Sequence, residues 1–365
     1  MDAGPAIDSI EIAAYTVPTA SPEADGTFWW DSTTMVVVEA AAGGARGIGY
    51  SYADVATAHF IDKHLRDVVV GKSAMAIGEA WVAIGWRVRN LGRAGVASMA
   101  ISAVDNALWD LKARLLGISV CGLLGPARAS IPAYGSGGFT TYSNDELQRQ
   151  LGGWVDDGMR AVKMKIGTHP QEDLERVSAA REAIGDRAEL YVDANGAFGA
   201  KQALGFAWAF ADLDVSWFEE PVSSDDLAGL RLVREQGPPG MDVAAGEYGY
   251  DTPYFERMLS TGAVDVMQAD ATRCGGISGF LQVNALCEGH CAKLSAHTAP
   301  SIHAHACCAA TRAVNVEYFF DHYRIEQMLF DGAIRAVNGE LKPDLSRPGF
   351  GIDLKRADAE KYRVR

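Results

Sequence analysis

The sequence contains no run of eighteen or more apolar residues, so it has no candidate for a transmembrane helix. Its N-terminal residues, which include Asp2, lack the basic segment and apolar run of a secretory signal. Cysteine is scarce, because six residues in a chain of 365 do not form the dense pattern of a disulfide framework. We therefore expect a cytoplasmic protein whose thiols are reduced.

Positive charge is in deficit. The 33 Lys and Arg residues are outnumbered by 47 Asp and Glu residues, which gives a formal net charge of −14. This excess of negative charge disfavours binding to nucleic acids and to anionic membranes. A small anionic substrate stays compatible with it, because a bound divalent cation can invert the local field.

The remaining composition is that of a soluble globular protein, with 48% hydrophobic and 22% charged residues. The chain length suits a barrel with a smaller domain attached. In the first region, residues 1–125, we predict strands at Ile7–Thr16 and Thr33–Ala40 and a helix at Ala97–Leu116. The glycines of Gly43-Gly44 and Gly47-Ile48-Gly49 are interpreted as tight turns between strands.

Short apolar, β-branched segments alternate with amphipathic helical segments over residues 126–320. This alternation indicates a parallel barrel, and the continuous hydrophobicity of the segments is typical of strands buried on both faces. The predicted strands are Ile131–Gly138, Ala161–Gly167, Glu189–Asn195, Val215–Pro221, Met241–Glu247, Ala263–Asp270, Lys293–Ala299 and Arg312–Phe319. Residues 321–365 are predicted to return to the first region.

Nearly every predicted barrel strand ends in a charged or titratable residue. The segment Tyr191–Phe198 shows the pattern best, because its apolar run stops at Asp193 and Asn195, whose side chains point the same way from an extended chain. Taken alone, Asp, Asn and Gly also fit an ordinary turn. Because the pattern recurs on successive strands, it predicts a ring of functional groups at the catalytic mouth of the barrel.

Three carboxylates on successive strands, Asp193, Glu219 and Glu247, suit a hard divalent cation such as Mg²⁺, which prefers oxygen ligands. Alternation along the strand allows only one of Glu219 and Glu220 to face the centre. The alternative is three unrelated surface acids.

Lys163 and Lys165 also point the same way along their strand, and two nearby ammonium groups are expected to lower each other's pKa toward that of a useful base. His297 is a second candidate base, oriented by Asp270 on the neighbouring strand. Together these residues predict abstraction of a proton next to a metal-bound carboxylate, with the metal stabilising the enediolate.

At this point the sequence resembles the enolase superfamily, and within it the mandelate racemase branch. The resemblance covers essentially the whole chain and rests on several short motifs together. They are Val-Lys-Met-Lys-Ile-Gly, Val-Asp-Ala-Asn, Phe-Glu-Glu-Pro, Ala-Gly-Glu247, Asp270, Ser-Ala-His297 and Val-Glu317.

The resemblance implies an α/β fold: a (β/α)7β TIM-like barrel with an α+β capping domain built from the N-terminal region and the C-terminal tail. It implies Asp193, Glu219 and Glu247 as Mg²⁺ ligands, Lys165 and the His297–Asp270 pair as acid/base groups, and a homo-oligomer. Lys163 is implied to tune Lys165 and to contact the substrate carboxylate, and Glu317 is implied as an acid that hydrogen-bonds the same carboxylate. Asn195 is a further candidate for substrate binding. Because cap loops close over the barrel mouth in this family, Trp29 and Trp30 become candidate substrate neighbours.

The resemblance leaves the reaction open. Proton removal followed by loss of the β-hydroxyl would make the protein an acid-sugar dehydratase giving a 2-keto-3-deoxy acid, which is the outcome we favour. Return of the proton on the opposite face would instead make it a racemase or epimerase of a 2-hydroxy acid. Cycloisomerisation of a lactone or anhydro sugar acid is a third outcome.

A zinc-binding module and a non-catalytic barrel are alternatives of another class. The zinc hypothesis rests on cysteines and histidines that cluster around the seventh strand, although no Cys-x-x-Cys pair occurs among them. They are Cys287, His290, Cys291, His303, His305, Cys307 and Cys308.

Overall fold

The computed structural model describes residues 4–364, and within that range eight parallel strands close into a barrel. Each strand pairs with the next along the chain, and the eighth pairs with the first. The barrel strands are β4 (Ile131–Gly137), β5 (Ala161–Lys165), β6 (Glu189–Asp193), β7 (Val215–Glu219), β8 (Asp242–Ala245), β9 (Val266–Ala269), β10 (Lys293–Ala296) and β11 (Ala313–Phe319).

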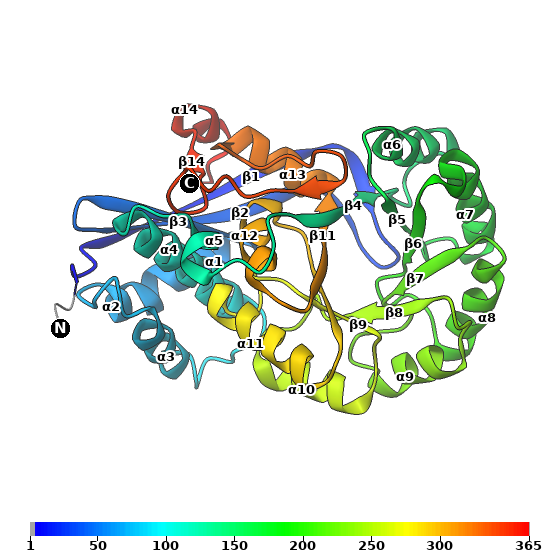
Figure 1. The fold of residues 1–365 in the computed structure, drawn as a ribbon, viewed down its shortest axis with the longest axis horizontal. Helices are drawn as coiled ribbons and strands as arrows, with labels where there is room; N and C mark the ends of the chain where they lie inside the picture. The colour runs from blue at the N-terminus through cyan, green and yellow to red at the C-terminus, as the bar shows by residue number, and fades with distance from the viewer. Residues whose placement is uncertain (1–3, 365) are drawn as a thin grey trace.

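Helices cover the outside of the barrel, with one after each strand from β4 to β10 (Figure 1). They are α6 (Asn144–Asp156), α7 (Pro170–Ile184), α8 (Ala200–Ala211), α9 (Leu227–Gln236), α10 (Thr252–Thr261), α11 (Gly276–Gly289) and α12 (Pro300–Ala309). The fold class expected from the sequence, (β/α)7β with a cap, is confirmed. The reason is visible in β5, where every residue is buried and lysines alternate with Val162 and Met164.

The cap is a three-stranded antiparallel sheet with helices packed on one face, drawn in blue at the left of Figure 1. Its strands are β1 (Ser9–Ala24), β2 (Trp29–Ala42) and β3 (Ala45–Tyr52). Its helices are α1 (Val55–Phe60), a π-helical turn at Ile61–Leu65, α2 (Arg66–Val69), α3 (Ile77–Arg87), α4 (Val96–Leu115) and α5 (Val120–Leu124). The β1–β2 hairpin extends beyond the predicted strands Ile7–Thr16 and Thr33–Ala40. It crosses a register shift between Pro18 and Glu23 and continues to Ala24 and Trp29, so that only residues 25–28 form the turn.

The interpretation of Gly47 and Gly49 as turn residues is wrong. Both lie within β3, where the backbone of α4 passes directly over them: a Cβ on Gly49 would lie 2.3 Å from the Ala107 nitrogen. Only glycine permits this approach of a helix to a sheet. Gly43 and Gly44 do form the β2–β3 turn, with φ of 54° and 80°.

Helix α4 also joins the cap to the barrel. Its side chains, together with Ser51 of β3, hydrogen-bond residues 271–278 of the barrel, which begin directly after Asp270 and include the start of α11. Asn106 bonds the Ala271 carbonyl and the Ile277 N–H, and Asp105 accepts the Ser278 N–H. The cap therefore fixes the position of a segment at the barrel mouth.

The C-terminal segment contacts both parts of the molecule. It contains α13 (Phe320–Leu329), β12 (Phe330–Asp331), β13 (Glu340–Leu341), β14 (Asp353–Leu354), α14 (Arg356–Ala359) and a 3₁₀ turn at Glu360–Tyr362. Strand β13 pairs with the start of β4, whereas the Val364 N–H donates to the Ala14 carbonyl of β1. The boundaries at 125 and 320 stay predictions.

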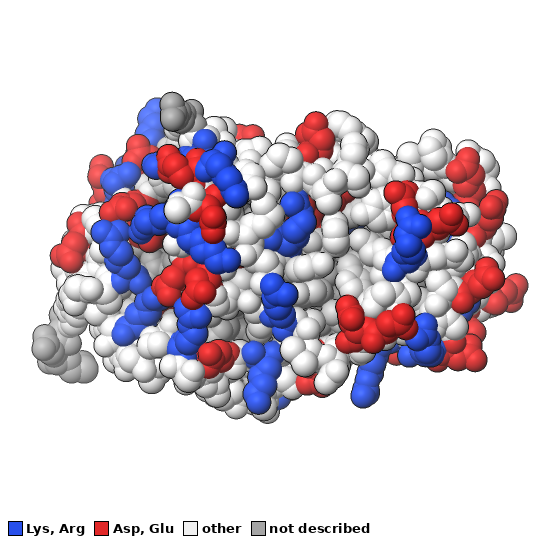
Figure 2. Space-filling model, turned by 90° about the horizontal axis from the view of Figure 1, so that it is seen from above, with Lys and Arg blue, Asp and Glu red and all other residues white. Residues whose placement is uncertain are grey.

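None of the helices among residues 4–364 is both long and apolar enough to cross a membrane. On the face of the molecule shown in Figure 2, basic and acidic side chains are interspersed.

Candidate active site

The charged strand ends meet at one mouth of the barrel. Asp193 and Glu219 are the last residues of β6 and β7, and Glu247 follows β8 by two residues. Asp270 and His297 directly follow β9 and β10, and Glu317 lies within β11. All of these side chains are buried or nearly so.

Asp193, Glu219 and Glu247 form the one group within residues 4–364 with the arrangement of a metal site, because one ligand atom from each lies within 4.8 Å of the others. Burial and the Asp193 carboxylate hold the pKa of Glu219 well above its ordinary range. The Glu247 Oε2 atom accepts no hydrogen bond from any described residue. Three clustered, buried carboxylates fit a hard divalent cation. Of the Glu219–Glu220 pair, it is Glu219 that joins this cluster.

Two neighbours orient the carboxylates. The Trp217 indole N–H donates to Glu219 Oε2 over 3.0 Å, and the Asn195 backbone N–H donates to Asp193 Oδ1 over 2.8 Å. Asn195 has φ of 46°, a conformation that asparagine tolerates better than most residues. Its own Oδ1 is buried and without a hydrogen-bond partner among the described residues.

The lysines lie among the carboxylates. Lys163 Nζ is 2.6 Å from Glu219 Oε1 and 2.8 Å from Glu317 Oε1, and Lys165 Nζ is 2.5 Å from Asp193 Oδ2. Lys163 does lower the pKa of Lys165, as expected from the sequence, but the expected net depression of the lysine pKa is wrong for this arrangement. Burial lowers the pKa of both lysines, but the carboxylates outweigh burial and hold both values above the ordinary range.

His297 is held by a carboxylate, as predicted from the sequence. Its Nδ1 lies 2.8 Å from Asp270 Oδ2, and its Nε2 lies 3.3 Å from Glu247 Oε2 and 3.6 Å from Glu317 Oε2. Asp270 also accepts the Thr272 N–H over 2.6 Å. Burial raises the pKa of Asp270, but the bond and charge of His297 outweigh it and keep the value far below its usual range. Asp270 is therefore ionised and fixes the imidazole.

A cavity of about 490 Å³ opens above these groups, between the barrel mouth and the cap. From the barrel it is lined by Lys165, Asn195, Glu247, His297 and Glu317. Ten polar residues in its wall were not predicted from the sequence: Asp25, Ser32, Thr33, Thr34, Tyr52, Asp54, Tyr248, Arg273, Thr298 and His322. Arg273 carried a signal, because it lies three residues after Asp270 in a loop at the predicted mouth.

The two tryptophans of the hairpin lie in different surroundings. Trp30 lines the cavity, and its indole N–H donates to the buried Glu23 over 2.9 Å. Trp29 is 55% exposed and is not among the described residues that line this cavity. The hairpin turn itself is seated on the barrel, since a Cβ on Gly26 would lie 2.2 Å from the Ala194 carbonyl oxygen.

The cysteine–histidine cluster does not form a zinc site. Both ring nitrogens of His303 are engaged, one with the Ala271 N–H and the other with the Thr298 carbonyl. His305 likewise contacts the Cys121 N–H and the Phe350 carbonyl. These histidines are buried structural groups, so the zinc hypothesis is rejected.

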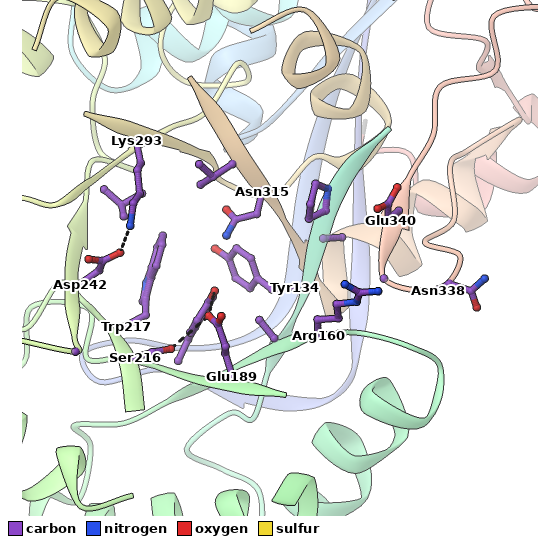
Figure 3. A pocket seen from close by; sticks show the side chains of 18 of the residues that line it. Tyr134, Arg160, Glu189, Ser216, Trp217, Asp242, Lys293, Asn315, Asn338 and Glu340 are labelled. Carbon is purple, nitrogen blue, oxygen red and sulfur yellow. Dashed lines mark hydrogen bonds and ion pairs between the residues drawn. The ribbon is translucent and has the colours of Figure 1, made fainter. Parts of the chain in front are cut away.

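A second hollow, of about 530 Å³, lies at the opposite mouth of the barrel, where the strands begin (Figure 3). Tyr134, Trp217 and Asn315 point into it, and Lys293 pairs with Asp242 at its edge over 2.7 Å. It is slightly larger than the upper cavity, but the groups suited to catalysis lie at the other end of the strands.

Two family models match the chain. Residues 10–125 match the N-terminal domain of the mandelate racemase / muconate lactonizing enzyme family, and residues 146–359 match the enolase C-terminal domain-like family.

Individual proteins match over nearly the whole length. A 3,6-anhydro-alpha-L-galactonate cycloisomerase from Streptomyces coelicolor is 33% identical over 95% of this chain and 97% of its own. The L-talarate/galactarate dehydratase of Salmonella typhimurium is 29% identical over 97% of this chain and 90% of its own. Its structure liganded with Mg and L-lyxarohydroxamate superposes with a TM-score of 0.90 at 27% identity, covering 99% and 94% of the two chains. A mandelate racemase/muconate lactonizing enzyme-like protein of solved structure from Rubrobacter xylanophilus is 52% identical, with a TM-score of 0.97 and coverage of 99% and 100%.

Proposed function

The chain belongs to the mandelate racemase / muconate lactonizing enzyme family of the enolase superfamily, and we propose that it is a Mg²⁺-dependent dehydratase of a sugar acid. In this reaction the proton α to the carboxylate is removed and the β-hydroxyl leaves as water. The enol that results tautomerises to a 2-keto-3-deoxy acid.

The observation that carries this proposal is the placement of two acid/base groups across the barrel mouth. Lys165 extends from β5 and His297 follows β10, strands that are not neighbours, and both line the same cavity. Each is bonded to a carboxylate of its own, Asp193 or Asp270. A substrate bound between them would meet one proton-transfer group on each face.

The cluster of Asp193, Glu219 and Glu247 would hold the cation. When bound there, Mg²⁺ supplies positive charge beside the substrate carboxylate and takes up carboxylate charge that otherwise keeps the lysines protonated. We assign contact with the substrate carboxylate to Lys163 as well, which is fully buried between Glu219 and Glu317.

The proton transfers then fall to two side chains. Lys165 removes the α-proton, and His297, kept in position by Asp270, protonates the departing hydroxyl so that it leaves as water. Glu317 accepts a hydrogen bond from the Ser136 hydroxyl over 2.6 Å and lines the same cavity at the barrel mouth.

Cycloisomerisation is the second candidate, favoured by the similarity to the anhydrogalactonate cycloisomerase. In an anhydro sugar acid the β-oxygen belongs to a ring ether, so the same elimination opens the ring and releases no water. Both reactions share the α-proton step and the residues assigned to it.

Proton NMR in D₂O with Mg²⁺ and a panel of acid sugars tests the proposal. Loss of the α and β signals with a new deuterated methylene identifies a dehydratase, whereas loss of the α signal alone identifies a racemase or epimerase. The Lys165→Ala variant is expected to lose α-proton exchange, and His297→Asn to lose the elimination step. Wild-type turnover by both variants would refute the assignment of these residues.

A further inference from the structure

The positively charged side chains of the cavity lie at the barrel mouth, beside the carboxylates. Of the described residues that line the cavity, Lys165 and Arg273 are the ones with a Lys or Arg side chain. Lys165 Nζ is bonded to Asp193. Arg273 Nη1 donates to the Glu247 carbonyl over 3.1 Å and lies 3.4 Å from Glu247 Oε1. Both cations therefore contact the proposed metal ligands at the barrel mouth, and neither forms a hydrogen bond or ion pair with a described residue of the cap.

The cap end of the cavity has the opposite character. Its wall carries the hydroxyl-bearing residues Ser32, Thr33, Thr34 and Tyr52, and its charged group is the carboxylate of Asp54. Asp25 also lines the cavity, but from the hairpin turn that is seated on the barrel near Lys165. Asp54 is exposed and uses one oxygen to cap α1 through the Ala56 N–H. Any group of the substrate that reaches this end meets hydroxyls and negative charge.

An uncharged imidazole completes this wall. His322 is buried, with its ring stacked on that of Tyr52 at a centroid distance of 3.4 Å and an angle of 7° between the planes. Burial keeps the pKa of His322 well below its usual range. Its Nδ1 has no hydrogen-bond partner within residues 4–364. A neutral histidine of this kind binds a hydroxyl group and offers no charge to a carboxylate.

We propose that the cavity is selective for sugar acids with a single carboxylate and discriminates against the corresponding diacids. The inference rests on the proposed function, and it specifies the substrate class. The first carboxylate is bound at the barrel mouth, and the far end of the substrate carries hydroxyl groups toward the cap. A second carboxylate there would face Asp54 and meet no Lys or Arg side chain among the described cap residues that line the cavity, which is unfavourable. The relatives include enzymes named for a monoacid and for diacids, so similarity alone does not choose between the classes.

The test uses matched pairs of substrates, such as galactonate with galactarate and gluconate with glucarate. The members of a pair share their configuration and differ only in a terminal hydroxymethyl or carboxylate group. We expect α-proton exchange with at least one monoacid, and a kcat/KM lower by about 100-fold or more for its diacid partner. Raising the ionic strength should reduce this ratio, because salt screens the carboxylate of the cap wall.

Asp54→Asn is the informative variant, because asparagine still caps α1 and removes only the charge. It should raise kcat/KM for the diacid and leave that for the monoacid nearly unchanged, so the ratio falls by roughly 3- to 10-fold. Asp186→Asn, an equal change of charge at an exposed site outside the cavity, should leave the ratio as it is.

Equal or better turnover of the diacids would overturn the selectivity while leaving the proposed function in place. An unchanged ratio in Asp54→Asn would overturn the role of the cap wall. Absence of α-proton exchange with every pair in the presence of Mg²⁺ would overturn the proposed function, and the selectivity with it.

Discussion

Asp105 of α4 is expected to destabilise the folded protein as the pH rises toward neutrality. Its carboxylate is 1% exposed and accepts two bonds from Ser278, one from the backbone N–H over 2.9 Å and one from the hydroxyl over 2.7 Å. Burial is the main cause that raises its pKa from 3.8 to about 7, and the bonds from Ser278 offset only part of that effect. The folded state therefore favours the protonated acid.

The sign and size of the effect follow from proton linkage. Because the folded-state pKa is the higher one, the contribution of Asp105 is fully present below pH 3.8 and is lost as the pH rises to about 7. A shift of about three units corresponds to roughly 4 kcal/mol, of which roughly 2–3 kcal/mol falls between pH 5 and 8. Asp105→Asn removes the charge and can still bond Ser278, since its amide accepts from the N–H and donates to the hydroxyl oxygen.

Urea unfolding of wild type and Asp105→Asn at several pH values measures this directly. The difference in the free energy of unfolding should move in favour of the variant by roughly 2–3 kcal/mol between pH 5 and 8, and then level off. Asp105→Ala is the control, because it removes the same titrating group but leaves the Ser278 groups unpaired. It should show the same change with pH and remain about 1–3 kcal/mol less stable than Asp105→Asn at every pH. A difference between wild type and Asp105→Asn that does not change with pH would refute the reasoning.

The other predictions concern the site and the cap. Asp270→Asn removes the charge that holds His297 and should lower kcat by on the order of 10²-fold or more at an unchanged melting temperature; near-wild-type turnover would contradict this role. Treatment with EDTA should abolish α-proton exchange, and Mg²⁺ should restore it; activity that survives complete metal removal would exclude the proposed cation site. Gly49→Ala places a Cβ 2.3 Å from the Ala107 nitrogen and should destabilise the fold by about 1–3 kcal/mol or more. Gly153→Ala, in a helix with open space around the added carbon, should be neutral or stabilising by up to about 1 kcal/mol; equal melting temperatures for the two variants would contradict the packing of α4 on β3.

The barrel could be predicted because each of its strands is recognisable from its own short sequence. An apolar segment that ends in a charged residue marks both a buried strand and the direction of its mouth, and Asp193, Glu219 and Asp270 each follow this pattern. Because parallel strands begin at one end of the barrel and finish at the other, groups far apart in the chain meet without further information. The sequence therefore predicted where the ring of residues lies, and their catalytic roles stay predictions.

What the sequence could not provide depends on contacts between distant segments. Tyr52 and His322 come from the cap and from the start of α13, and no periodicity relates them before the chain folds. The predicted direction of the Lys165 pKa shift was wrong because the prediction considered Lys163 on the same strand and omitted Asp193 on the next strand, with which Lys165 pairs. Gly49 could be read as a turn because the helix that covers it lies about fifty residues away. The cytoplasmic location and the homo-oligomer stay predictions.

The hydrogen bonds between the cap and residues 271–278 limit which parts of the chain can be exchanged in a chimera with a related enzyme. Four cap residues, Ser51, Ser102, Asp105 and Asn106, hold the backbone that directly follows Asp270. The barrel therefore depends on the cap for the conformation of part of its mouth. A chimera that exchanges only the β1–β2 hairpin keeps this joint intact, whereas one that transplants a whole foreign cap must also import matching partners for residues 271–278. We therefore expect that the β1–β2 hairpin can be exchanged between related proteins, whereas α4 must be kept together with its own barrel.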